Sequence, residues 1–130
     1  MNIPKELKYS KDHEWVRVEG NKAVVGIDDY AQSQLGDVVF VELPQIGSDI
    51  ACGDRFSVVE SVKAVSDIYA PVSGTVIEAN ERLTDTPECI NEDPYGQGWI
   101  AVIELKDVSE VDRLLDSKAY QILLEEGEQS

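Results

Sequence analysis

The sequence predicts a mainly β domain, a small sandwich or partly closed barrel, followed by a C-terminal helix. Between residues 14 and 105, about seven or eight short, valine-rich runs alternate apolar with polar residues, which is typical of strands. After residue 108 the apolar residues recur at three- and four-residue intervals, which is typical of an amphipathic helix. At 130 residues the chain is long enough to bury one core.

The strands are expected where the alternation is clearest. They cover residues 14–19, 22–27, 37–43, 55–62, 64–70, 75–80 and 99–105. Gly20-Asn21 joins the first two runs and is a good hairpin turn. Asp28 is suited to cap a short helix that extends through Leu35 and ends at Gly36.

The remaining segments are expected to be turns and helices. Residues 81–95 are polar and interrupted by proline, so they can hold only a helical turn or two. The amphipathic pattern covers residues 108–126, as one helix or as two short ones with a break at Asp116-Ser117. Its apolar stripe is expected to pack on the strand core. Residues 125–130 are expected to be a frayed tail.

A lysine lies at the centre of the strand pattern. The runs before and after Lys63 form the two arms of a hairpin, with the lysine at its tip. A free lysine has a pKa of about 10.4, so at neutral pH its amine is almost always charged. A catalytic Schiff-base lysine needs desolvation or a neighbouring cation, and neither is indicated here. Lys63 is therefore either a solvated turn residue or an amine placed to be acylated by another enzyme.

The composition limits the partners that the chain can have. Eleven basic and 26 acidic residues give a net charge of -15, which repels nucleic acid and anionic lipid and suits docking to basic protein surfaces. No apolar run is long enough to span a bilayer, and residues 1–9 lack the apolar core of a signal peptide. A soluble, intracellular monomer is expected.

The two cysteines, Cys52 and Cys89, lie 37 residues apart, and the chain has one histidine. This spacing argues against a zinc site and for two reduced thiols.

Several motifs together resemble a known family. The segments Gly47-x5-Gly53-Asp54, residues 59–64 and residues 70–76 resemble the lipoyl/biotinyl attachment domain. The more specific segments resemble the H-protein family of the glycine cleavage system; they are residues 11–16, 25–27, 31–37, 39–44 and 91–99. The resemblance extends from about Leu7 to Leu124, with the motifs in the same order.

The resemblance implies a barrel-sandwich hybrid of two antiparallel sheets, with a short helix near residues 28–35 and a C-terminal helix. It implies one lipoyl-carrier domain over residues 1–130, with its core at about residues 7–124. Lipoate would be amide-linked to Lys63 as N6-lipoyllysine. The chain would be a carrier component rather than an enzyme.

The resemblance also implies the partners. They are the pyridoxal-phosphate glycine decarboxylase (P protein), the tetrahydrofolate-dependent aminomethyltransferase (T protein), the dihydrolipoyl dehydrogenase (L protein), and a lipoate ligase or octanoyl/lipoyl transferase. The carrier would take the aminomethyl group of glycine from the first to the second, and the third would reoxidise the arm. The compartment would be the cytoplasm of a bacterium, or the mitochondrial matrix for a processed eukaryotic chain.

The aminomethyl group is cationic, and the resemblance implies an acidic surface cleft that shields it. Glu14 and Asp67 match the carboxylates of that cleft, whereas Asp12 stands where some relatives have a small hydroxyl residue. The alternatives are a solvated carboxylate at a strand start for Glu14 and an ion pair with Lys63 for Asp67. His13 is expected to have a structural or rim role.

Other functions remain open on the sequence alone. Biotin carriers usually have methionine on both sides of the lysine, where this chain has Val62 and Ala64. Lipoyl domains of 2-oxoacid dehydrogenases typically read Asp-Lys-Ala and lack the His-Glu-Trp segment. A lipoate relay or scaffold that hands lipoate to other carriers, and a plain acidic interaction module, are further alternatives. An enzyme is disfavoured because no paired acid–base residues, metal cluster or phosphate loop are recognisable.

Overall fold

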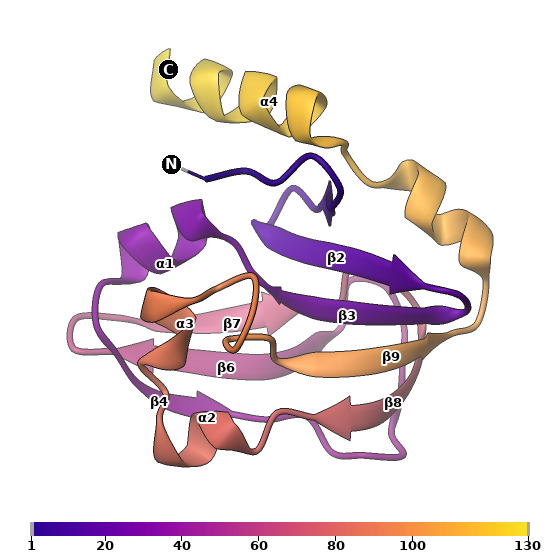
Figure 1. Cartoon of the computed structure of the whole chain (residues 1–130), viewed down its shortest axis with the longest axis horizontal. Helices are drawn as coiled ribbons and strands as arrows, with labels where there is room; N and C mark the ends of the chain where they lie inside the picture. The colour runs from indigo at the N-terminus through magenta and orange to yellow at the C-terminus, as the bar shows by residue number, and fades with distance from the viewer. Residues whose placement is uncertain (1, 130) are drawn as a thin grey trace.

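The protein consists of two antiparallel sheets with helices at their edges (Figure 1). The structure is a computed structural model that describes residues 2–129. One sheet has six strands in the order β1-β2-β3-β9-β8-β5, and the other has three in the order β4-β6-β7. The predicted class, a mainly β barrel-sandwich hybrid with a C-terminal helix, is confirmed.

The strands agree closely with the alternating runs. They are β1 (Lys8–Tyr9), β2 (Glu14–Glu19), β3 (Lys22–Ile27), β4 (Val38–Glu42), β5 (Asp49–Ile50), β6 (Arg55–Ser61), β7 (Val65–Tyr69), β8 (Gly74–Ala79) and β9 (Ala101–Leu105). The short strands β1 and β5 were not predicted, because two residues are too few to show alternation. Both lie at the edges of the six-stranded sheet.

The short helices follow the predicted punctuation. They are α1 (Asp29–Leu35), α2 (Arg82–Asp85) and α3 (Cys89–Glu92). The Asp28 carboxylate accepts a hydrogen bond from the backbone of Ala31, and Gly36 ends α1 at a φ of 77°, as its glycine predicts. None of the helices in the described part of the chain has the length and apolarity needed to cross a bilayer.

The C-terminal region differs from a single helix. Residues Val108–Arg113 form a 3-10 helix, η1, and Ser117–Gln129 form α4. The chain between them is extended, and Leu115 pairs with Tyr9 through two backbone hydrogen bonds of 2.8 Å. The break therefore begins earlier than the predicted Asp116-Ser117. The helix α4 continues to Gln129, beyond the expected start of a tail, and Ser130 lies outside the described residues.

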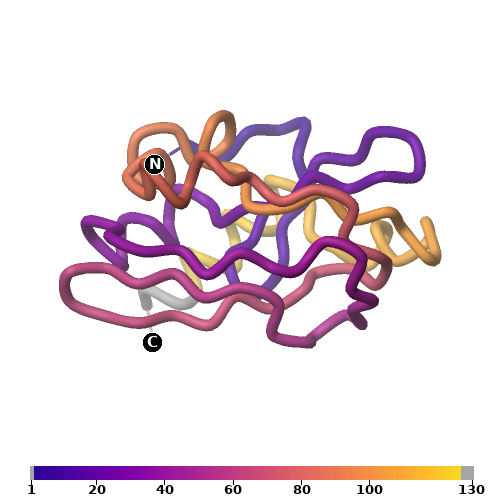
Figure 2. Tube along the Cα trace, turned by 90° about the horizontal axis from the view of Figure 1, so that it is seen from below, coloured from indigo at the N-terminus to yellow at the C-terminus, as the bar shows by residue number. Residues whose placement is uncertain are grey.

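The core forms between the inner faces of the two sheets. Val25, Val59 and Ile103, from three different strands, are fully buried in one apolar cluster. A second cluster lies under α4, where the rings of Tyr9 and Tyr120 stack at 4.7 Å. Burial of a side chain of this size contributes about 1.5–3 kcal/mol. The core fixes the strands rigidly, and Figure 2 shows the β6–β7 hairpin extending from them at one end of the molecule.

Candidate functional site

The β6–β7 hairpin holds Lys63 at its exposed tip. Its strands pair in register down to Glu60 and Val65, and the turn follows. The Ser61 hydroxyl oxygen accepts hydrogen bonds from the backbone N–H of Lys63 at 3.2 Å and of Ala64 at 3.0 Å. Ser61 thus shapes the turn, because its side-chain oxygen holds two backbone N–H groups of the turn in place. The backbone of Lys63 is fixed, while its side chain lies in solvent.

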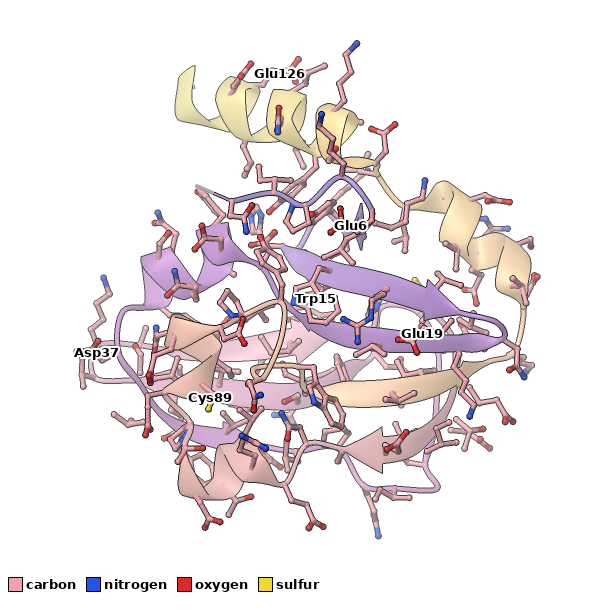
Figure 3. All side chains as sticks on the ribbon, in the orientation of Figure 1. Glu6, Trp15, Glu19, Asp37, Cys89 and Glu126 are labelled. Atoms are coloured by element: carbon pink, nitrogen blue, oxygen red, sulfur yellow. The ribbon has the colours of Figure 1, made fainter. Side chains whose placement is uncertain are left out.

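The tip rests against the loop between α1 and β4. The backbone N–H of Val62 donates to the Asp37 carbonyl at 3.0 Å. The Lys63 side chain passes over Gly36, where an added Cβ would lie 3.3 Å from the lysine Cε. Gly36 therefore meets two demands, a positive φ and room for the lysine. Figure 3 shows Asp37 at this end of the molecule and Glu19 toward the other.

Asn91, on α3, holds that loop in place. Its amide nitrogen donates to the Gly36 carbonyl at 2.8 Å and to the Gln32 side chain at 3.0 Å. Its side-chain oxygen accepts the backbone N–H of Val38 at 2.9 Å. One side chain thus joins the end of α1 to the start of β4. Sequence reasoning missed this role, although the residue belongs to the segment 91–99 that carried the family resemblance.

Glu14 is a buried carboxylate, with only 1% of its surface exposed. Its alternative description as a solvated strand-start residue is therefore wrong. The Ser10 hydroxyl donates to its Oε1 at 2.6 Å, and the Ser10 oxygen in turn accepts the Glu14 backbone N–H at 3.1 Å. Burial raises the pKa of the Glu14 carboxyl to about 7, while the hydrogen bond from Ser10 opposes the shift. A carboxyl with this pKa can be neutral or ionised at physiological pH.

A pocket of about 290 Å³ opens beside Glu14. The lining comes from β1 and the turn into β2, the start of β2, the turn before β6, the segment after β7, and η1 with the segment after it. The lining residues are Tyr9, Ser10, Lys11, Asp12, Glu14, Cys52, Gly53, Ala70, Pro71, Glu110, Arg113, Leu114 and Leu115. Asp12 lies here too, and its charge contributes to the raised pKa of Glu14.

The Cys52 thiol, which also lines this pocket, donates to the Pro71 carbonyl at 3.4 Å. Burial raises the pKa of the thiol, so Cys52 is a poor nucleophile.

Asp67 lies on the exposed side of β7. Its carboxylate is 3.7 Å from the Arg55 guanidinium, so its partner is Arg55 and not Lys63. The pair is solvent-exposed and contributes little to stability. Along β7, Lys63 precedes the strand, Asp67 lies in its middle, and the backbone of Tyr69 at its end lies beside Glu14. Along the chain, Asp67 thus lies between the Lys63 turn and the end of β7 that contacts Glu14 of β2.

The comparisons with known proteins agree on one family. A family model described as glycine cleavage H-protein matches residues 7–127. The chain belongs to the glycine cleavage H-protein family. The resemblance and the fold inferred from the sequence motifs are both confirmed.

Individual H proteins match the chain along almost its whole length. The glycine cleavage system H protein of Geobacillus thermodenitrificans is 59% identical over 127 residues, covering 98% of this chain and 100% of the relative. That of Carboxydothermus hydrogenoformans is 55% identical over 124 residues, covering 95% of each. A crystal structure of a glycine cleavage system H protein from Mycobacterium marinum superposes with a TM-score of 0.83 at 40% identity, covering 91% of this chain and 95% of that one.

His13 has a structural role within this H-protein fold. Its Nδ1 is hydrogen-bonded to the Tyr120 hydroxyl at 2.6 Å, and burial lowers the pKa of its imidazole. It adopts a φ of 69°, which is uncommon for a residue with a side chain. Nearby, Asp28 is buried, its pKa is raised to about 6 by burial, and its Oδ2 has no hydrogen-bond partner among the described residues. His13 thus links the segment before β2 to α4, and neither His13 nor Asp28 lines the Glu14 pocket.

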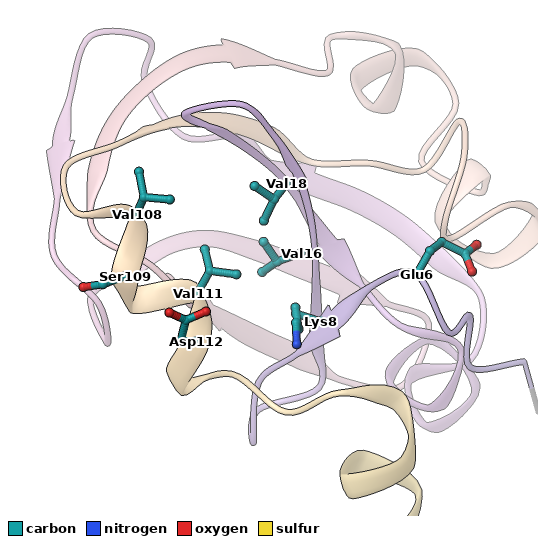
Figure 4. Close-up of a pocket in the computed structure, with 8 residues that line it drawn as sticks. All are labelled: Glu6, Lys8, Val16, Val18, Val108, Ser109, Val111 and Asp112. Atoms are coloured by element: carbon teal, nitrogen blue, oxygen red, sulfur yellow. The ribbon is translucent and has the colours of Figure 1, made fainter.

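A second pocket, of about 460 Å³, lies between β2 and η1 (Figure 4). Valine side chains form its floor, and Lys8 and Asp112 stand at its rim. It lies at the opposite end of the molecule from the Lys63 turn (Figure 1). None of the residues predicted for the site lines it.

Proposed function

We propose that the chain is the lipoyl carrier of a glycine cleavage system, with lipoate amide-linked to Lys63. The observation that carries the proposal is the exposed lysine on a hairpin tip whose backbone is fixed by Ser61, in a chain of the H-protein family. An attachment point of this kind must be accessible to a modifying enzyme and rigid enough to present the same amine each time. Lys63 meets both conditions.

The surroundings of Lys63 suit an amide-linked group. Among the described residues, no carboxylate lies within ion-pair distance of its amine, so acylation breaks no salt bridge. The change removes one positive charge, and the net charge goes from -15 to -16. The side chain already lies over Gly36, a surface without a side chain of its own. A neutral arm can lie there without leaving a buried charge unpaired.

When bound, the lipoyl group would supply a dithiolane that accepts the aminomethyl group of glycine together with a pair of electrons. The carrier would serve the glycine decarboxylase, then the aminomethyltransferase, then the dihydrolipoyl dehydrogenase. Tethering makes each transfer nearly intramolecular, with effective concentrations on the order of mM. The bacterial relatives support a cytoplasmic setting.

Glu14 and Asp67 are proposed to receive the cationic amine that the arm brings. A cation beside a carboxyl lowers its pKa, so arrival of the amine favours the ionised form of Glu14 and releases its proton to solvent. The exposed Asp67 lies between the attachment point and the Glu14 pocket and offers a first contact. We expect Glu14→Ala to speed loss of the aminomethyl group from the loaded arm, whereas an unchanged lifetime would argue against this role.

Reconstitution tests the carrier function. The chain is lipoylated, combined with the glycine decarboxylase, and the exchange of labelled bicarbonate into glycine is followed. We expect exchange to depend on the concentration of the lipoylated chain and to be absent with Lys63→Arg. A lipoylated chain that supports no exchange, but passes lipoate to other acceptor domains, would show the relay function instead.

A further inference from the structure

Ser10 is the centre of a set of hydrogen bonds in the loop between β1 and β2. Its hydroxyl donates to Oε1 of Glu14 at 2.6 Å, and its oxygen accepts the backbone N–H of Asp12 at 3.2 Å and of Glu14 at 3.1 Å. Its backbone N–H donates to the Glu14 carbonyl at 2.9 Å, and its carbonyl accepts the N–H of His13 at 3.2 Å. Ser10 therefore closes the loop with both its side chain and its backbone.

The loop that Ser10 closes carries two carboxylates of the Glu14 pocket, those of Asp12 and Glu14. Its backbone is unusual, because His13 has a φ of 69°. A serine oxygen that accepts nearby backbone N–H groups stabilises a turn of this kind. The position of Glu14 in the pocket therefore depends on Ser10.

The contact between Ser10 and Glu14 favours the ionised form of the carboxyl. A distance of 2.6 Å is typical of a hydroxyl that donates to a carboxylate. Ser10 is the only side chain in the described part of the chain that is hydrogen-bonded to the Glu14 carboxyl, and the backbone N–H of Tyr69 also favours its ionisation. Burial would otherwise keep the carboxyl neutral, so the hydroxyl opposes the effect of burial.

The other ionisable groups around Glu14 act without a hydrogen bond to it. Asp12, on the same loop, and Asp28, between β3 and α1, disfavour its ionisation. The pocket is also lined by ionisable groups from β1, the loop, the turn before β6 and η1; they are Tyr9, Lys11, Cys52, Glu110 and Arg113. Among residues 2–129, neither of the two basic groups forms an ion pair with Glu14. The hydroxyl of Ser10 is therefore the side chain with the most direct control of this carboxyl.

We propose that Ser10 is a positioning residue for Glu14: its hydroxyl orients the carboxylate in the pocket and keeps it available in ionised form to a cationic amine. The inference rests on the proposed role of Glu14. A carboxylate favours the charged form of an amine beside it, whereas a neutral carboxyl does not. The pocket therefore holds the amine only at pH values at which Glu14 ionises, and Ser10 extends that range to lower pH.

The first test is an NMR titration of the Glu14 carboxyl carbon in the unmodified chain, with the signal assigned by its loss in Glu14→Gln. Ser10→Ala removes the donor, so the midpoint is expected to rise from about 7 by roughly one to two pH units. Ser10→Thr keeps a hydroxyl and is expected to restore the lower midpoint. Ser57→Ala is the matched control, because Ser57 is also buried but its hydroxyl donates to a backbone carbonyl, that of Glu42, at 2.7 Å.

The second test is the lifetime of the aminomethyl group on the loaded chain as a function of pH. In Ser10→Ala the pH above which the group is retained is expected to rise by the same amount as the titration midpoint. Ser10→Cys, whose thiol is a weak donor of similar size, is expected to move both values in the same direction. It serves as the second variant if circular dichroism shows that Ser10→Ala does not fold.

An unchanged midpoint in folded Ser10→Ala or Ser10→Cys would overturn the inference, because Ser10 would then affect stability alone. A lifetime that changes in Glu14→Gln but not in the Ser10 variants would overturn it as well and leave the proposed role of Glu14 intact. A lifetime that is the same in the wild type and in Glu14→Gln at every pH would overturn the proposed role of Glu14, and the role of Ser10 with it.

Discussion

The burial of Glu14 leads to a specific prediction about pH and stability. Replacing Glu14 by glutamine removes an ionisable group from the pocket, keeps its size and keeps an oxygen to accept the Ser10 hydroxyl. We expect the free energy of unfolding of the variant, relative to the wild type, to increase as the pH rises. The physical reason is that the wild type must ionise a buried carboxyl, whereas the variant has none to ionise.

The magnitude follows from the two pKa values. The pKa of Glu14 is about 7 in the folded protein, against 4.5 for an exposed glutamate. The difference of about 2.5 corresponds to about 3 kcal/mol. Between these values the folded protein binds more protons than the unfolded chain, so the free energy of unfolding falls as the pH rises from 4.5 to 7. The loss is complete above pH 7 and absent below pH 4.5.

Urea denaturation at pH 5 and pH 8 measures this loss of stability, because the two values lie below and above the pKa of about 7 that Glu14 has in the folded protein. Both values also lie above the isoelectric point of about 4.2, so the protein carries a net negative charge at each. The stability of Glu14→Gln relative to the wild type should improve by about 2–3 kcal/mol between the two. Glu19→Gln, an exposed position on the same strand, should show no such change. A difference between Glu14→Gln and wild type that is constant with pH would refute the reasoning, because the raised pKa would then be absent.

Three further predictions concern packing and hydrogen bonding in the fold. Gly26→Ala should lower the stability by about 1–3 kcal/mol in thermal unfolding, because the new methyl group would lie 2.7 Å from the Trp15 indole nitrogen; an unchanged Tm would contradict this. Asn91→Ala should cost about 2–3 kcal/mol and speed amide exchange in the loop before β4, because three hydrogen bonds are lost; exchange at the wild-type rate would show that the loop does not depend on them. Tyr120→Phe should cost about 1 kcal/mol and shift the NMR titration of His13, because the hydroxyl at 2.6 Å is removed while the ring stays stacked; an unmoved titration would contradict the contact.

Much of the fold could be predicted because the sequence marks it locally. Valine alternation gave the long strands, Gly20-Asn21 gave the first hairpin turn, and Asp28 with Gly36 marked both ends of α1. These signals work because each depends on residues adjacent in the chain. The two-residue strands β1 and β5 could not be predicted this way, because two residues are too few to show alternation, even where the partner strand is near in the sequence, as β2 is for β1.

The C-terminal break shows a limit of periodicity. The apolar spacing continues across residues 114–116, yet Leu115 leaves the helix to pair with Tyr9. A pairing with a residue more than a hundred positions away has no local signature. The helical pattern therefore identified the amphipathic segment but placed its interruption too late.

The site was only partly visible in the sequence. Lys63 could be found because it stands alone at the centre of a hairpin pattern and within a family motif. The burial of Glu14 could not, because it depends on Ser10 and on strands that meet only in the folded protein. The ion pair of Asp67 with Arg55, rather than with Lys63, likewise depends on the register of β6 against β7.

The mass of the chain after expression together with lipoylation enzymes tests the account most directly. We expect an increase of one lipoyl group, located on Lys63 by fragmentation, and no increase in Lys63→Arg. A biotinyl increment, or a lipoyl group that persists when Lys63 is replaced, would contradict it.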